Sequence, residues 1–224
     1  ATGLDRRIAL TVLSKVGAKT HHIVIGAMLV GFLLAFVVPS TTARVACLMP
    51  IMMGFILAFN VDKQSRFAGL LVITTSQTAS IWNVGIKTAA AQNMVAIGFI
   101  EKQLKVQITW GEWFVAAAPF AALLTVALYF IMTRMMKPEM EEIAGGQETI
   151  RRQLAELGPM TAKEWRLLAV MLVLLGFWAT EKVLHNIDTS STTIAAIGLM
   201  LLPGIGVMDW KTSQKGFPWG TVLL

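Results

Sequence analysis

Charged side chains are scarce in this chain. Asp, Glu, Lys and Arg make up only 14% of its 224 residues, whereas soluble domains carry roughly 25%. Hydrophobic residues account for 55%, and the mean hydropathy is +0.66. This scarcity of charge excludes an ordinary soluble domain and predicts an all-α integral membrane protein that is surrounded by the lipid bilayer.

Cysteine and histidine are also rare. The single cysteine, Cys47, excludes an intrachain disulfide, and the three histidines have no metal-ligand spacing. The net charge of +6 does not indicate nucleic-acid binding, because the basic residues lie in loops between apolar runs. We therefore expect no intrachain disulfide, no metal site of histidine and cysteine ligands and no nucleic-acid partner.

The sequence also lacks an initial methionine and a signal-peptide pattern. Its last residues, 221–224, open an apolar run that stops at once. Both ends are typical of a piece of a longer membrane protein.

The rest of the chain is organised around residues 37–44, which two apolar arms flank, at 23–38 and 45–59. Each arm has about 15 residues, or roughly 23 Å as a helix, whereas a membrane crossing needs ~20 residues. The arms therefore favour a re-entrant helical hairpin over 23–59, which enters and leaves by one face. The alternative is a surface turn between two short transmembrane helices.

The tip of this hairpin is polar. Pro39 cannot continue the first arm, and Ser40, Thr41 or Thr42 can cap the second. Non-helical polar backbone at membrane depth persists only where protein or a water-filled cavity covers it. Such a tip is a natural place to bind an ion or an anionic solute.

Residues 67–100 form a long segment that is apolar at both ends and polar in the middle. The middle is too polar to face lipid, so we expect a discontinuous transmembrane helix that faces a protein interior. The expected break lies near Gly85–Asn93.

The remaining segments alternate between apolar and polar. We expect an interfacial helix and connection at 1–22, transmembrane helices at 114–133, 167–184 and 192–208, a cytoplasmic connection at 134–166 and a polar loop at 209–218. With the N-terminal segment in the cytoplasm, fourteen of the 19 Lys and Arg residues lie on the cytoplasmic side and three lie outside. This asymmetry obeys the positive-inside rule and predicts a multi-pass protein of the plasma (inner) membrane.

Arg44 and Lys87 are the only charged residues within the apolar segments. A charge at membrane depth is costly and usually marks a solute or ion pathway; the other interpretation of Arg44 is a side chain that extends to the interface. No acidic residue lies near either one in the sequence, so an anionic ligand is the expected partner. Helix N-termini after the tip and after the break would attract the same sign of charge.

Several motifs occur in an order that resembles the divalent anion/sodium symporter (DASS) family. Pro39–Arg44, followed by Leu48–Ile51, resembles the Ser-Asn-Thr hairpin tip, and Thr88–Asn93 resembles the Thr-Gly-x-x-Pro-Asn loop that breaks the next helix. Further matches lie at Gly3–Ala9, at Leu157–Thr161 with Glu164, at Leu202–Gly204 and at Pro218–Thr221. The resemblance covers nearly the whole chain.

This resemblance implies a fold. Family members are homodimeric carriers with two inverted repeats, a scaffold domain and a moving transport domain. The chain would hold part of the first repeat, with 23–59 and 67–100 in the transport domain. The second repeat would begin with 167–184, 192–208 and 209–224. The family's solute lies between two hairpin tips, of which this sequence holds only the first.

The resemblance, together with the two intramembrane charges, implies a site. Solute would be bound by Ser40, Thr41, Thr42, Arg44, Lys87, Thr88 and Asn93. A coupling sodium ion would be held by Ser40, Thr41, Gly85, Ala89 and Asn93. However, Thr41 stands where the family commonly has Asn, and Ala89 and Gln92 stand where Gly and Pro are usual. Lys87 would then supply the positive charge that sodium otherwise brings, so sodium symport and carboxylate exchange both stay open.

We therefore expect a secondary active transporter of small di- and tricarboxylates, of the succinate, malate, 2-oxoglutarate and citrate class. This carrier interpretation implies in addition that the protein is not an enzyme and has no resident cofactor. One alternative is a carrier of sulfate or another inorganic oxyanion. The other is a structural subunit of the membrane that transports nothing.

Overall fold

The computed structural model describes residues 2–17, 19–58, 61–62, 64–142 and 146–216. Within these ranges every named element is a helix, which confirms the predicted all-α class. The chain divides into two compact units, Asp5–Gly158 and Pro159–Leu224, the latter grouped with residues 1–4.

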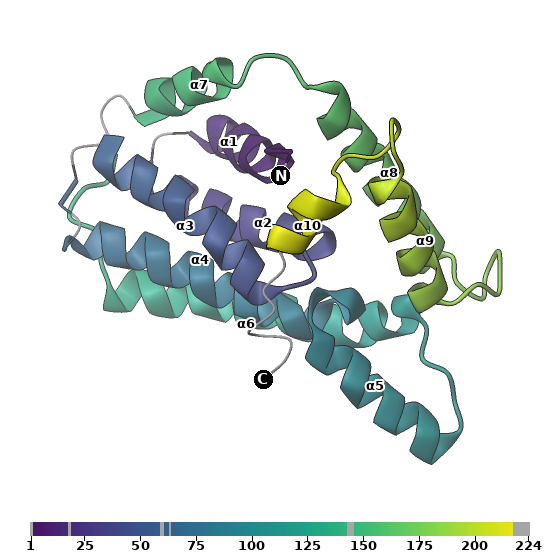
Figure 1. Cartoon of the computed structure of the whole chain (residues 1–224). Coiled ribbons are helices and arrows are strands. Elements are labelled where there is room, and N and C mark those ends of the chain that lie inside the picture. Colours follow the sequence, from purple (N-terminus) through teal and green to yellow (C-terminus); the bar gives the residue numbers. More distant parts are fainter. Residues whose placement is uncertain (1, 18, 59–60, 63, 143–145, 217–224) are drawn as a thin grey trace. The chain divides into compact units, whose positions relative to one another are not determined.

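Helix α4 (Arg66–Gly85) lies at the centre of the unit Asp5–Gly158. It packs against α2 (Thr20–Val37), α3 (Thr41–Ala58) and α6 (Trp110–Met135), as Figure 1 shows. Its polar middle faces this protein interior: the side chains of Thr74, Thr75 and Thr78 are all buried. The Thr75 and Thr78 hydroxyls donate to the carbonyls four residues earlier, at 2.6 and 2.7 Å. Polar residues within this apolar segment are thus accommodated by burial against protein, as predicted.

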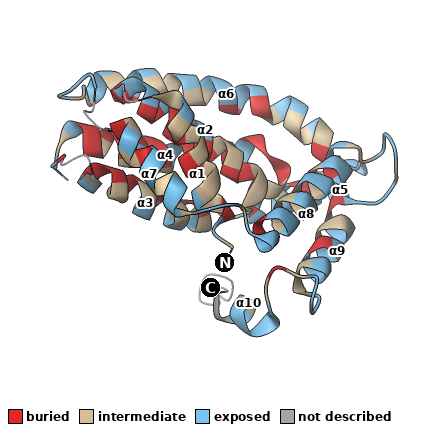
Figure 2. Cartoon of the chain, turned by 90° about the horizontal axis from the view of Figure 1, so that it is seen from above, coloured by how far each residue is buried: buried red, intermediate tan, exposed pale blue. Residues whose placement is uncertain are grey.

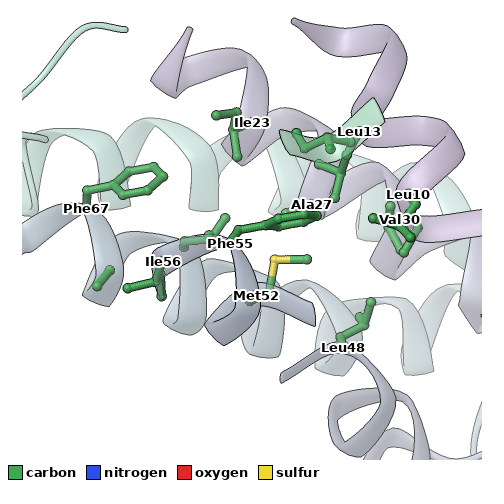
Figure 3. Close-up of a cluster of buried hydrophobic side chains, with 14 of the residues drawn as sticks. Leu10, Leu13, Ile23, Ala27, Val30, Leu48, Met52, Phe55, Ile56 and Phe67 are labelled. Atoms are coloured by element: carbon green, nitrogen blue, oxygen red, sulfur yellow. The ribbon is translucent and has the colours of Figure 1, made fainter. Parts of the chain in front are cut away.

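The main hydrophobic core lies where α1 (Leu4–Val16) meets α2 and α3. Figure 3 shows Leu10 and Leu13 of α1, Ala27 of α2, and Met52 and Phe55 of α3 gathered in this core. The interfacial helix predicted at 1–22 therefore contributes its apolar face to a protein core. Arg7 fixes the same helix to the end of the 134–166 segment by donating to the carbonyls of Leu157 and Gly158.

The two arms of the predicted hairpin are longer than the sequence indicated. Helices α2 and α3 have 18 residues each, or about 27 Å at ~1.5 Å per residue. The polar residues Thr20, His21 and His22 join the first turn of α2, and residues 41–44 form the first turn of α3. Length alone therefore does not distinguish a re-entrant hairpin from two crossings. Pro39 lies between the arms, where it ends the first helix as predicted.

Among the described helices, α2 and α6 are long and apolar enough to cross a membrane. The part of α3 at Thr41–Leu57 and the whole of α9 (Thr189–Leu201) are apolar but shorter. Only 11% of the most apolar window of α6 is buried, and Figure 2 shows exposed residues along this helix. Its exposed side chains are large and apolar, among them Val115, Phe120, Leu123, Val126 and Phe130. Such a surface is typical of a helix that faces lipid.

The segment at 134–166, which was expected to be a connection, contains the helix α7 (Gly146–Glu156). This helix is strongly polar, but Ile150 is fully buried, and Leu154 and Leu157 pack against the same core. Three apolar residues at helical spacing were the available signal.

The unit Pro159–Leu224 contains α8 (Ala162–Ala179), α9 and the short α10 (Trp210–Gly216). Thr161 and Glu164 form a capping box that starts α8, five residues before the predicted 167–184. Asp188 caps α9, which ends at Leu201 rather than at residue 208. Helices α8 and α9 pack against each other. The motif at 218–221 lies outside the described residues.

Candidate anion-binding site

The tip between α2 and α3 has the geometry of a helix start. The Ser40 hydroxyl accepts a hydrogen bond from the backbone N–H of Ala43 at 3.3 Å, and the Ser40 carbonyl accepts from the N–H of Arg44 at 3.0 Å. Ser40 thus caps α3, which is one of the predicted capping arrangements. The positive end of the α3 dipole lies at this tip.

The discontinuous segment is interrupted within the predicted range. Helix α4 ends at Gly85, a single turn of 3-10 helix follows at Lys87–Ala89 (η1), and α5 runs over Ala91–Leu104. The side chain of Asn93 holds this break together. Its Nδ2 lies 2.5, 3.0 and 3.3 Å from the carbonyl oxygens of Asn83, Ile86 and Lys87.

Arg44 joins the tip to the break. Its side chain is fully buried, at 0% exposure. Nη2 donates to Asn83 Oδ1 and, at 3.2 Å, to the carbonyl of Ala89, while Nε lies 3.4 Å from the Ser40 carbonyl. Because Ala89 lies two residues before α5 and Arg44 lies in the first turn of α3, the Arg44 side chain links the start of α3 to the backbone just before α5.

One nitrogen of the Arg44 guanidinium has no partner among the residues that the structure describes. Nη1 is buried and makes no hydrogen bond, and no described carboxylate lies within 4.0 Å of this side chain. A buried charge without a counter-ion is destabilised by several kcal/mol. The interface interpretation of Arg44 is therefore wrong for this structure. An anion at Nη1 would offset this penalty through charge-assisted hydrogen bonds.

The threonines of the predicted site have different surroundings. Thr41 Oγ1 accepts a hydrogen bond from Asn83 Nδ2, and Thr88 Oγ1 accepts one from the indole N–H of Trp110 at 3.2 Å. Thr42 is exposed at the start of α3. The structure therefore gathers Ser40, Thr41 and Arg44 at the tip with Ala89 and Asn93 at the break.

Lys87 is buried but is held in another way. Only 5% of it is exposed, and its Nζ donates to the carbonyl of Ile108 at 2.6 Å. Ile108 lies in the connection between α5 and α6, where its N–H donates to Glu101 at 2.9 Å. The Lys87 ammonium thus fixes the break to this connection.

The residues predicted to hold sodium are also used within the protein. The Ala89 carbonyl accepts from Arg44. At Gly85, a Cβ atom would lie 2.9 Å from the Ala121 Cβ and from the Trp82 ring, so this glycine permits close packing of α4 on α6. Among the described residues no group of three His, Cys, Asp or Glu side chains gathers as a metal site would require. A cation here would rely on hydroxyl and carbonyl oxygens.

Two residues of this region were not predicted as part of the site. Asn83 contacts both Arg44 and Thr41, and Trp110 contacts Thr88. The signal for Asn83 was its place as an amide shortly before the break. Trp110 gave no signal, because a tryptophan ahead of an apolar helix is ordinarily placed at the membrane interface.

The whole chain, residues 1–224, matches the family model described as the sodium:sulfate symporter transmembrane region. The chain belongs to this family. The family corresponds to the divalent anion/sodium symporters whose motifs the sequence resembles, and its members are membrane transporters rather than enzymes.

Curated members of the family align with almost the whole chain. A protein named only "Membrane protein" from Cupriavidus necator is 52% identical over 100% of the chain and 44% of its own length. The citrate/succinate antiporter of Escherichia coli K12 is 28% identical over 99% of the chain and 46% of its own length. The sodium-dependent dicarboxylate transporter SdcS of Staphylococcus saprophyticus is 27% identical over 99% and 47%. The chain thus spans about half the length of these relatives.

Proposed function

We propose that the protein is a secondary active carrier of small di- and tricarboxylates. The observation that carries this proposal is the buried Arg44 guanidinium, whose Nη1 has no partner in the part of the chain that the structure describes. A carboxylate fits because it accepts charge-assisted hydrogen bonds from a guanidinium and from helix N-termini together. The relatives' names, which specify citrate, succinate and dicarboxylates, support the same class of solute.

In this proposal the solute contacts both the tip and the break. Arg44, Ser40, Thr41 and Thr42 approach it from the tip, and Thr88 and Asn93 approach it from the break. The tip is part of a re-entrant hairpin in a transport domain. Burial of Arg44 against residues of the break supports the hairpin, because a turn at the membrane surface would leave this side chain exposed. The carrier is a multi-pass homodimer of the inner membrane.

The coupling mode follows from the fixed charge. The Ala89 carbonyl, a predicted sodium ligand, accepts from Arg44 instead. Since Lys87 is held by Ile108, we assign to Arg44 the charge that replaces sodium. A guanidinium cannot leave the site, so an empty carrier keeps an unpaired charge and crosses the membrane reluctantly. Obligatory exchange of one carboxylate for another follows.

Flux into proteoliposomes that contain the full-length protein tests this proposal. Labelled succinate should enter vesicles loaded with unlabelled succinate, without external sodium, and should not accumulate in vesicles that contain no carboxylate. Net uptake into empty vesicles, or strong dependence on sodium, would overturn the exchange mode. Exchange of sulfate without exchange of succinate or citrate would instead favour the inorganic-oxyanion carrier.

A further inference from the structure

Asn83 lies at the junction between the tip and the break. It is the third residue from the C-terminal end of α4 and is half-buried. Its Oδ1 accepts from Arg44 Nη2, and its Nδ2 donates to Thr41 Oγ1. The orientation of the amide is determined by its neighbour, because a guanidinium can only donate hydrogen bonds and the oxygen must face it.

This orientation decides what the Thr41 hydroxyl can do. Because its oxygen already accepts from Asn83, its proton is directed elsewhere. The same holds for two other hydroxyls: the Ser40 oxygen accepts from the Ala43 N–H, and the Thr88 oxygen accepts from the Trp110 indole N–H. Within the described ranges, none of these three hydroxyl protons is donated to a protein acceptor.

We propose that Asn83 is a positioning residue that makes this site a set of hydrogen-bond donors. Its oxygen holds the Arg44 guanidinium so that Nη1 stays free, and its nitrogen turns the Thr41 hydroxyl outward as a donor. The ligand that such a set recognises is an oxyanion with two or more acceptor oxygens. This inference rests on the proposed function and names a determinant of its selectivity for anions.

Asn83→Asp separates this role from a purely structural one. The introduced carboxylate has nearly the same shape and still accepts from Arg44, so the fold keeps this contact and gains an ion pair. The same carboxylate neutralises the guanidinium and takes the Thr41 proton, so the site loses two of its donors for an anion. Asn83→Ala removes both hydrogen bonds but adds no negative charge.

Thermal stability and affinity for succinate should therefore rank Asn83→Asp and Asn83→Ala in opposite orders. In purified full-length protein, we expect Asn83→Asp to unfold at a temperature equal to or above that of Asn83→Ala. It should nevertheless bind succinate with a Kd about tenfold higher than that of Asn83→Ala. Ser80→Ala, an exposed residue of the same helix whose hydroxyl donates to the Ser76 carbonyl, is the matched control and should leave both quantities unchanged.

Asn83→Asp protein that binds succinate as tightly as Asn83→Ala would overturn the inference. If Asn83→Asp does not fold, a double-mutant cycle replaces it: the losses in affinity from Asn83→Ala and Thr41→Val should be less than additive, and additive losses would overturn the inference. Wild-type protein that binds sulfate but not succinate contradicts the carboxylate proposal, and the same ranking measured with sulfate then tests Asn83 by itself.

Discussion

Arg44 and Lys87 are both buried cations, yet their surroundings give them different roles. The Lys87 ammonium donates to a backbone carbonyl 2.6 Å away in the α5–α6 connection. The Arg44 guanidinium donates to the tip and the break with two of its nitrogens and leaves the third unpartnered. A buried cation whose hydrogen bond is satisfied can serve packing, whereas one with an unpartnered nitrogen lacks a counter-charge that a ligand could supply.

At the same scale, we expect Gly85→Ala to destabilise the fold. The added methyl group would lie 2.9 Å from both the Ala121 Cβ and the Trp82 ring, and overpacking of this kind costs about 1–3 kcal/mol. Gly98→Ala is the control, because a Cβ at Gly98 of α5 meets nothing within 4 Å. Thermal unfolding in detergent should show a lower Tm for Gly85→Ala and an equal or higher Tm for Gly98→Ala. Equal Tm values for Gly85→Ala and wild type would contradict the role assigned to Gly85.

The sequence identified the two buried cations of this region but not their partners. Arg44 and Lys87 stand out because each is a lone charge in an apolar segment. The partners of Arg44 are Asn83 and Ala89, 39 and 45 residues further along the chain. Only the packing of α3 on α4 brings them together, and no local pattern encodes that pairing.

At the scale of elements, both ends of α4 are held by hydrogen bonds from other parts of the chain. At its start, Glu139 accepts from the N–H groups of Arg66 and Phe67, at 2.7 and 3.2 Å. At its end, the indole N–H of Trp113 donates to the Val84 carbonyl at 2.9 Å, and Asn93 donates to the Asn83 carbonyl. These contacts satisfy backbone groups that a helix leaves free at its ends, so α4 can stop at the break.

The Glu139 contact predicts a pH dependence of stability. The N–H of Arg66 holds the pKa of the Glu139 carboxyl below its ordinary value of 4.5. A carboxyl whose pKa is lowered by folding stabilises the fold above its ordinary pKa, and this contribution is lost as the pH falls through the lowered value. Glu139→Gln should therefore lower Tm at pH 7 and match wild type in acid. Glu141→Gln, an exposed neighbour, should not change Tm at pH 7. A constant difference between Glu139→Gln and wild type from pH 7 to pH 3 would contradict the assignment.

Hydrophobic runs and polar interruptions predicted most elements but not their ends. The break falls within the predicted range because Gly85 and the polar residues after it are visible in the sequence. The arms are longer than predicted because polar residues continue both helices, at 20–22 in α2 and at 41–44 in α3. Helix α7 was missed because one buried residue, Ile150, and two partly buried leucines are a weak signal against a polar background.

At the scale of the whole molecule, the proposed re-entrant hairpin has a consequence for labelling. Cys47 is the single cysteine of these 224 residues, so Cys47→Ser, together with replacement of any cysteine in the rest of the full-length protein, gives a background without thiols. In full-length protein on that background, we expect Ser40→Cys to react slowly with an impermeant maleimide from outside and to be protected by succinate. Lys102→Cys, in the predicted external segment, should react quickly whether or not succinate is present. Equal reactivity of the two positions in every condition would favour the surface turn.

The central proposal is that Arg44 binds the anion, and it is tested most directly by the Kd for succinate of full-length protein in sodium-free buffer. Arg44→Gln removes a charged hydrogen bond worth about 1.5–3 kcal/mol, so its Kd should rise by roughly 10- to 150-fold. Lys87→Met is the control. It should lower Tm, because the Ile108 carbonyl loses its buried donor, but its Kd should stay within about threefold of the wild-type value. Folded Arg44→Gln protein with the wild-type Kd, or an equal loss of affinity in Lys87→Met, would contradict the proposal.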